Sequence, residues 1–250
     1  MSRRWIRFIV VFSAVLLSVS ACLADRTGEQ RIGLIKGGTI SKGPIGLEKD
    51  IQYNYIQAGG DDFVLIGIEG SGMNPHKEGV GLTWIDVLRE YNVIDFSIAN
   101  ELELWNDKIR DKAYENYTTS IVNTVRSKYP GIKTVGVYAF SKGASGADGL
   151  CSKLQEEGFT VAFVWLNDAF TLHDMPYIKS AVENGRIMIY LRYSNNKRLS
   201  QVCKEMHKAW TDRGNVDSRH IPCSHGGLVR YETFTDELTG AIKKAAGQIR

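Results

Sequence analysis

The segment from Thr134 to Leu150, TVGVYAFSKGASGADGL, limits the folds open to this chain more than any other. An apolar run stops abruptly at Ser141, and small residues follow before helical spacing begins. A strand, one serine in a tight turn and a helix packed back on the strand form a nucleophile elbow. Because the turn strains the backbone at the serine, the residues two before and two after it must be small. Here they are Ala139 and Gly143, so the motif is A-x-S-x-G where G-x-S-x-G is usual.

The same segment has a plainer interpretation. Serine is a preferred helix N-cap, and small residues are needed wherever a helix crosses a sheet closely. The segment alone therefore leaves open an ordinary strand–turn–helix with Ser141 as its cap, and short motifs carry false positives.

The first 21 residues differ from the rest of the chain. Arg3, Arg4 and Arg7 precede an apolar run from Phe8 to Val19. A charged start followed by an apolar stretch too short for a stable membrane span is typical of an export signal. We therefore expect residues 1–21 to be a signal peptide, and the protein to be secreted, periplasmic or held at a bacterial cell envelope.

Two cleavage sites compete at the end of this signal. The sequence VSAC at 19–22 resembles the lipobox of bacterial lipoproteins, in which Cys22 would receive lipid and become the new N-terminus. The sequence CLA at 22–24 is instead a small-x-small site for ordinary signal cleavage. We favour the lipobox, so that membrane contact is expected only through Cys22, followed by a short leader over 22–30 and a single domain over 31–250.

Charge and cysteine usage exclude several classes of partner. The first 21 residues hold three arginines and no acidic residue, so the net charge falls from +3 to zero without them. No basic tract remains that would indicate nucleic-acid binding.

Cys203 and Cys223 flank one predicted helix–strand unit and are the pair favoured if a disulfide forms, whereas Cys151 is expected to be a buried thiol. No C-x-x-C or H-x-x-x-H spacing indicates a metal site, and we expect no cofactor.

Strand and helix patterns alternate along the rest of the chain. A continuous apolar run at 63–68 is typical of a strand buried on both faces. Further strands are expected at 31–35, 51–57, 93–99, 134–140, 159–166, 186–193 and 216–221, and helices at about 82–91, 107–129, 142–157, 176–184, 199–211 and 231–249. The first two strands, separated by glycines, predict an antiparallel opening pair. Strands alternating with helices predict an α/β fold with a mostly parallel sheet covered on both faces.

In this order of elements the chain resembles the α/β-hydrolase superfamily over nearly its whole mature length. The resemblance rests on the antiparallel opening, the Gly-Ser-Gly loop after the third strand, the serine after the fifth and a histidine after the last. It implies an α/β-hydrolase fold with little or no cap domain. It also implies a catalytic base at His225, in the loop PCSHGG before the last helix, where Gly226 and Gly227 would let the ring approach the serine.

The acidic member of a triad is less obvious. The family usually places it after the seventh strand, but here that strand is followed by SNN, without a carboxylate. Asp168, after the sixth strand, is the better candidate, because some branches of the superfamily place the acid there. Asp174 is the reserve, and Asn195 could orient the imidazole without a charge. A turn or N-cap role is the alternative for Asp168.

The oxyanion hole needs two donors. The elbow supplies the backbone N–H of Lys142, and the loop after the third strand supplies the other, for which we choose Ser71 over Gly70 or Gly72. A Ser–Lys mechanism is the competing idea, but the side chain after the nucleophile normally points away from it. The loop is not followed by the G-K-[ST] of a phosphate-binding loop, so nucleotide binding is not expected.

These residues together predict an exported serine hydrolase that cleaves a carboxylic ester of a small-molecule or lipid-like acyl substrate. A peptidase or acyltransferase would use the same residues. The alternative from another class is a non-catalytic ligand-binding surface protein on the same scaffold. Trp84, Trp105 and Trp165 either line an apolar substrate pocket or belong to the core.

Overall fold

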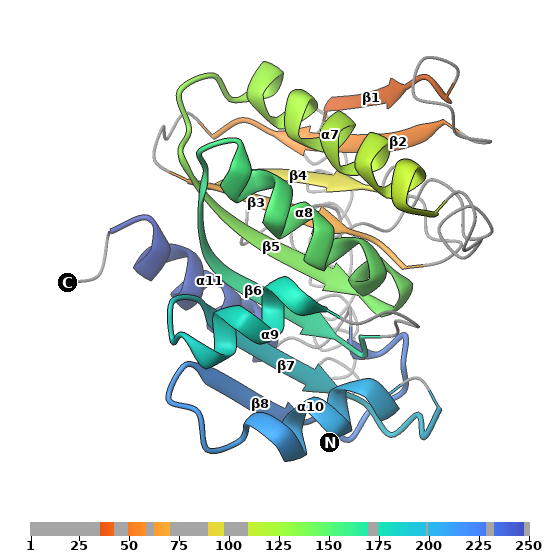
Figure 1. Cartoon of the computed structure of the whole chain (residues 1–250), viewed down its shortest axis with the longest axis vertical. Helices are drawn as coiled ribbons and strands as arrows, with labels where there is room; N and C mark the ends of the chain where they lie inside the picture. The colour runs from red at the N-terminus through yellow and green to blue at the C-terminus, as the bar shows by residue number, and fades with distance from the viewer. Residues whose placement is uncertain are drawn as a thin grey trace, which may run out of the picture. The chain divides into compact units, whose positions relative to one another are not determined.

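A twisted sheet runs through the protein, and the residues that the structure describes contribute eight strands to it (Figure 1). The strands are β1 (Lys36–Ile40), β2 (Ile51–Ile56), β3 (Phe63–Ile68), β4 (Asn92–Phe96), β5 (Thr134–Phe140), β6 (Thr160–Asn167), β7 (Met188–Tyr193) and β8 (Val216–His220). Their order across the sheet is β1-β2-β4-β3-β5-β6-β7-β8. The pairs β1–β2 and β2–β4 are antiparallel and all others are parallel, which confirms the predicted mostly parallel sheet with an antiparallel opening.

The computed structural model describes residues 36–42, 50–58, 63–70, 90–97, 110–169, 175–198, 200–228 and 233–247. They belong to one compact unit, Lys36–Arg250. The predicted signal peptide and leader, and nearly all of the predicted helix at 82–91, lie outside these residues. Within them, no helix is both long and apolar enough to cross a membrane.

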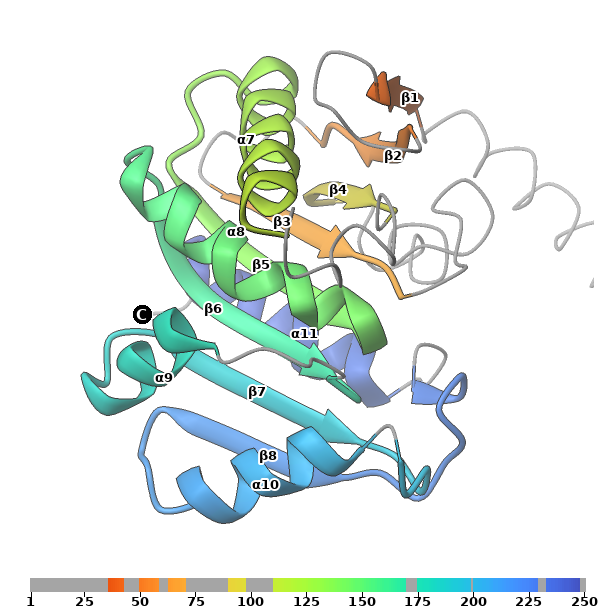
Figure 2. The ribbon, with the colours of Figure 1, turned by 45° about the vertical axis from the view of Figure 1, so that its right-hand side comes forward.

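Helices cover both faces of the sheet (Figures 1 and 2). Four of them pack on one face and enclose the main apolar core: α7 (Arg110–Lys128), α8 (Ala144–Glu156), α9 (Pro176–Glu183) and α10 (Gln201–Trp210). On the opposite face, α11 (Thr233–Ala245) packs against β3, β5 and β6. This arrangement puts the carboxyl ends of the parallel strands at one edge, which is where ligands bind in open α/β sheets.

The central strands are buried on both faces, as the continuous apolar runs predicted. Every residue of β3 is buried, and in β5 only Thr134 is partly exposed. A strand covered on both sides by helices gains no stability from alternating polar residues, so its sequence is apolar throughout.

The first turn of α9 is held against α8 by one carboxylate. Asp148, on α8, accepts hydrogen bonds at Oδ1 from the backbone N–H of Ile178 (2.8 Å) and at Oδ2 from that of Tyr177 (3.4 Å). These are free donors of the first turn of α9, which begins with Pro176 and has no side-chain cap of its own. Burial raises the pKa of Asp148, and the two amide donors partly oppose that rise.

The first strand differs from the prediction. The strand expected at 31–35 lies outside the described residues, and β1 occupies Lys36–Ile40, in the glycine-rich stretch expected to separate the first two strands. Gly38 pairs with Tyr53 of β2, and a Cβ at this position would collide with the Tyr53 ring. Glycine is present here to allow the aromatic ring to cross the neighbouring strand, and not to form a turn.

Candidate active site

Ser141 occupies the turn between β5 and α8 in the strained conformation that a nucleophile elbow requires. Its φ is +53°, in the left-handed region that residues other than glycine rarely adopt. It begins a short 3₁₀ turn, η1 (Ser141–Gly143), that leads directly into α8, and only 6% of the residue is exposed. The plainer interpretation, an N-cap serine, is wrong, because the N-cap positions of η1 and α8 are Phe140 and Gly143.

The small residues around the serine are needed for space. A Cβ on Gly143 would overlap the backbone carbonyl oxygens of Ile68 and Glu69, at the end of β3. A Cβ on Gly70 would lie 3.1 Å from the Cβ of Ser141. The chain leaving β3 therefore runs directly against the elbow, which is the place expected for the loop that carries the second oxyanion donor. The predicted donor itself, Ser71, lies outside the described residues.

Asp168 and His225 are brought together from distant parts of the chain. Asp168 directly follows β6, and His225 lies between β8 and α11, in the segment that continues from the carboxyl end of β8 (Figure 2). His225 Nδ1 lies 2.8 Å from Asp168 Oδ2. Asp168 is fully buried, whereas 22% of the His225 side chain is exposed. A buried carboxylate beside one ring nitrogen holds the imidazole in one tautomer and leaves its Nε2 available for proton transfer.

The His225 ring also lies against the elbow. It stacks on the ring of Phe140, the residue before Ser141, with centroids 4.6 Å apart and an angle of 23° between the planes. No hydrogen bond joins Ser141 Oγ to the imidazole in this structure. Hydrogen bonds between a nucleophile and its base are often long without substrate and shorten in the complex, so this geometry is compatible with general-base chemistry.

Asp168 is itself held by a residue that sequence reasoning missed. Ser194, directly after β7, donates two hydrogen bonds to its carboxylate, from the backbone N–H and from Oγ. Like Ser141, Asp168 has a left-handed backbone, with φ of +41°. Of the two alternatives to Asp168, Asn195 contacts His220 (Oδ1 to Nε2, 2.9 Å) and not His225, and Asp174 lies outside the described residues.

A buried polar network lies under this edge of the sheet. Trp165 Nε1 donates to Asn167 Oδ1 (2.8 Å), and Asn167 Nδ2 donates to Tyr138 Oη (2.9 Å). Burial raises the pKa of Tyr138 well above its ordinary value, and the negative charge of Glu69 raises it further. Trp165 is fully buried and therefore belongs to the core, while Trp84 and Trp105 lie outside the described residues.

The three described cysteines are free thiols. Cys151 is buried, as predicted, and Cys203 and Cys223 do not form a disulfide. Cys203 Sγ instead accepts a hydrogen bond from the backbone N–H of Ala169, next to Asp168 (3.1 Å). Burial raises the pKa of the Cys203 thiol to about 12, so it stays protonated at neutral pH.

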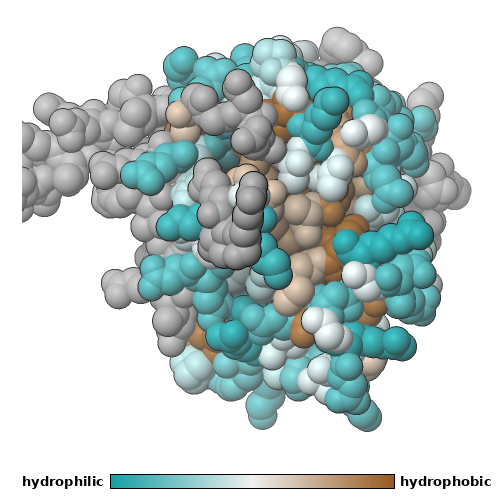
Figure 3. All heavy atoms as spheres, turned by 90° about the vertical axis from the view of Figure 1, so that its left-hand side faces the viewer, coloured by the Kyte–Doolittle hydropathy of each residue, from teal (hydrophilic) through white to brown (hydrophobic). Residues whose placement is uncertain are grey.

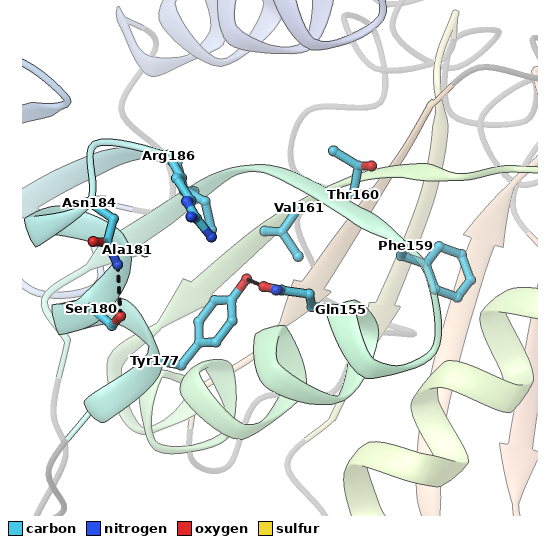
Figure 4. Close-up of a pocket in the computed structure, with 10 residues that line it drawn as sticks. Gln155, Phe159, Thr160, Val161, Tyr177, Ser180, Ala181, Asn184 and Arg186 are labelled. Carbon is cyan, nitrogen blue, oxygen red and sulfur yellow. Dashed lines mark hydrogen bonds between the residues drawn. The ribbon is translucent and has the colours of Figure 1, made fainter.

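A cavity of about 440 Å³ lies away from this site, at the starts of β6 and β7 (Figure 4). Its walls include Val161, Tyr177 and Arg186, and Tyr177 Oη donates to Gln155 Oε1 (2.7 Å). Figure 3 shows the side of the molecule at which the parallel strands begin, with apolar surface among hydrophilic side chains. None of the four predicted site residues that the structure describes lines the cavity.

Of the predicted site residues, the structure describes Ser141, Lys142, Asp168 and His225. It joins Asp168 to His225 by a hydrogen bond and places Lys142 in η1, directly after the serine. Among the described residues, no group of three or more His, Cys, Asp or Glu side chains could hold a metal ion. Together these four residues offer a strained serine with the backbone of Lys142 directly after it, an imidazole and a buried acid at one edge of a mostly parallel sheet.

Comparison with solved structures identifies the fold. A dienelactone hydrolase from Anabaena variabilis is 15% identical, with a TM-score of 0.57 over 84% of this chain and 97% of that one. The chain has the α/β-hydrolase fold. A bacterial heroin esterase is 16% identical (TM-score 0.57, 93% and 92% covered), and a Pyrobaculum calidifontis esterase 9% identical (0.57, 85% of each). No family model and no curated protein matches the sequence. Ser141 lies in the turn after β5, which is the position of the nucleophile elbow in this fold, and His225 lies in the loop after β8, the last described strand.

Proposed function

We propose that the protein is a serine hydrolase that cleaves a carboxylic ester through Ser141, His225 and Asp168. The observation that carries this proposal is the hydrogen bond between His225 Nδ1 and the buried carboxylate of Asp168, beside a serine with φ of +53°. A structural role for this histidine would not require the neighbouring serine to adopt a strained backbone, which proteins retain mainly at functional sites.

The reaction follows from these positions. Ser141 Oγ attacks the acyl carbonyl carbon while His225 Nε2 accepts its proton, and the resulting imidazolium is stabilised by Asp168. The tetrahedral oxyanion accepts hydrogen bonds from the backbone N–H of Lys142 and from the loop after β3, in which Ser71 is the proposed donor. His225 then returns the proton to the leaving alcohol. Water, deprotonated by His225, releases the acid from the acyl-enzyme and regenerates the serine.

Two further points support the proposal, one on ester chemistry and one on the nucleophile elbow. Solved structures with this fold include proteins described as a dienelactone hydrolase, a heroin esterase and other esterases, so the scaffold accommodates ester chemistry. The elbow residue Ala139 adds only one methyl group to the usual glycine pattern, and the serine still adopts its strained conformation. A small-molecule or lipid-like acyl ester is therefore the proposed substrate class.

We also propose that the protein is exported and held at a bacterial cell envelope by lipid on Cys22. The support is the charged and apolar sequence of residues 1–21 and the small residues before Cys22. Mass spectrometry of the mature N-terminus from expressing cells tests it: a lipid-modified Cys22 is expected, and an N-terminus at Asp25 would contradict it.

Hydrolysis of p-nitrophenyl acetate and butyrate by the full-length protein tests the catalytic proposal. We expect measurable turnover that falls by about 10³-fold or more in Ser141→Ala and His225→Ala. Turnover that persists in both variants would overturn the assignment of the site. Turnover of a peptide or acyl transfer to an added alcohol, without ester hydrolysis, would redirect the substrate class while retaining the serine.

A further inference from the structure

We propose that Ser194 is a positioning residue that holds the Asp168 carboxylate in the orientation needed by His225. This inference rests on the proposed function. Ser194 directly follows β7, and it is the neighbour of Asp168 across the carboxyl edge of the sheet, where Asp168 N–H donates to the carbonyl of Arg192 (2.8 Å). The residue is fully buried, so no bulk water competes for its hydrogen bonds.

Ser194 occupies both oxygens of the carboxylate. Its backbone N–H donates to Asp168 Oδ1 (2.7 Å), and its Oγ donates to Asp168 Oδ2. The same Oδ2 lies 2.8 Å from His225 Nδ1. A carboxylate bound at both oxygens cannot rotate about its Cβ–Cγ bond without breaking a charge-assisted hydrogen bond. The direction of Oδ2 toward the imidazole is therefore fixed from the β7 side.

The hydroxyl of Ser194 is oriented in turn. The backbone N–H of Asn196 donates to Ser194 Oγ at 3.1 Å, which occupies one lone pair of that oxygen. The Ser194 proton is then directed to Asp168 Oδ2, because a hydroxyl has one donor and two acceptor sites. The result is a chain of hydrogen bonds from Asn196 through Ser194 to the carboxylate and the imidazole.

This arrangement has a chemical consequence beyond stability. Ser194 Oγ–H and His225 Nδ1–H both donate to Asp168 Oδ2. The serine hydroxyl therefore offsets part of the negative charge of this oxygen that would otherwise face the imidazole. Removing the hydroxyl leaves more charge facing His225 and favours its protonated form. It also leaves Oδ2 bound by the imidazole alone, which weakens the orientation of the carboxylate and of the ring during proton transfer.

The test compares Ser194→Ala with Ser194→Thr, which keeps a hydroxyl, and with Ser200→Ala as a matched control. Ser200 is a fully buried serine of the same segment whose Oγ donates to the carbonyl of Asn196. We expect Ser194→Ala to lower kcat about tenfold with little change in KM, and to move the acid limb of the kcat/KM profile to higher pH. Ser194→Thr should restore both properties. If circular dichroism shows that the threonine variant does not fold, Ser194→Cys replaces it, with values between alanine and wild type, because a thiol is a weak donor.

Fluorophosphonate titration gives the fraction of active enzyme in each preparation. A loss of turnover in Ser194→Ala that matches a loss of active enzyme, with an unmoved acid limb, would overturn the proposal. The same limb shift in Ser200→Ala would also overturn it. The pH dependence of the His225 ring signals, measured by NMR in wild type and Ser194→Ala, separates this result from the proposed function. If the wild type has no esterase activity, a difference between the two proteins in the pH dependence of the His225 signals still supports the positioning role. The same pH dependence in both proteins contradicts it.

Discussion

The imidazole of His225 stacks on the ring of Phe140, the residue immediately before Ser141, with centroids 4.6 Å apart. The strand that leads into the serine therefore also holds the ring of the proposed base. One side of the imidazole is held by this stacking contact and one nitrogen by Asp168. The two contacts together leave the ring little freedom, which is what efficient proton transfer requires.

Replacing Phe140 by leucine should lower kcat more than it changes KM. Leucine retains an apolar side chain but loses the stacking contact, whose typical value of about 0.5–1.5 kcal/mol corresponds to roughly a two- to tenfold loss. Steady-state kinetics measures the effect. Phe163→Leu is the matched control, because Phe163 stacks on Phe63 (5.9 Å between centroids) and does not contact His225. Equal kinetic losses in the two variants would contradict a role for Phe140 in holding the base.

Replacing Asp168 by asparagine should reduce kcat by about 10³- to 10⁴-fold while the protein stays folded. The amide keeps the shape of the carboxylate, but it removes the charge that stabilises the imidazolium and can hold the wrong tautomer. Asp148→Asn is the control, because Asp148 is also an acid that accepts backbone hydrogen bonds, but it is half-buried and lies on α8. A wild-type kcat in a folded Asp168→Asn variant would show that another group orients His225.

Replacing Gly143 by alanine should destabilise the protein by about 1–3 kcal/mol and abolish most activity, because the new Cβ would overlap two backbone carbonyl oxygens. Backbone atoms cannot move aside as a flexible side chain can. Urea unfolding measures the change. Gly214→Ala is the control, since a Cβ there meets nothing within 4 Å, and it should change stability by less than about 0.5 kcal/mol. Similar stabilities for the two variants would contradict the close approach of β3 to the elbow.

The free energy of unfolding should fall as the pH rises from about 9 toward 12, in part because of Cys203. Burial raises the pKa of this thiol to about 12 in the folded protein, whereas the same thiol in the unfolded chain ionises near pH 9. The unfolded state therefore loses a proton first, and the folded state is disfavoured by up to about 1.4 kcal/mol per pH unit. Urea unfolding at several pH values should give a shallower decline for Cys203→Ala than for wild type. Parallel declines would contradict the buried, protonated thiol.

Much of this fold was predictable because its signals are local. The strands β3 and β5 are apolar runs that end at abrupt changes of composition, and a sheet covered on both faces demands such runs. Ser141 was predictable because a strained serine turn requires small neighbours that are visible in the sequence. The error at β1 has the opposite origin: Gly38 is explained by the ring of Tyr53 on another strand, which no local pattern shows.

The supporting residues of the site were not predictable for the same reason. Ser194 and Phe140 are an ordinary serine and an ordinary core aromatic in sequence, and their roles come only from contacts with Asp168 and His225. The absence of a disulfide between Cys203 and Cys223 is equally a matter of three-dimensional placement. Cys203 Sγ accepts a hydrogen bond from the backbone N–H of Ala169, which is 34 residues away in sequence.

The central claim is that Ser141 is an activated nucleophile, and fluorophosphonate labelling followed by peptide mapping tests it most directly. The reagent phosphonylates only a serine whose proton is taken by a base, so we predict one modified residue, Ser141, in the folded wild type. Labelling should be lost in Ser141→Ala and strongly slowed in His225→Ala. It should be retained in Ser145→Ala, because Ser145 is a buried serine of α8 that lies four residues after Ser141 in sequence. A folded wild-type protein that is not labelled, or that is labelled at another serine, would contradict the claim.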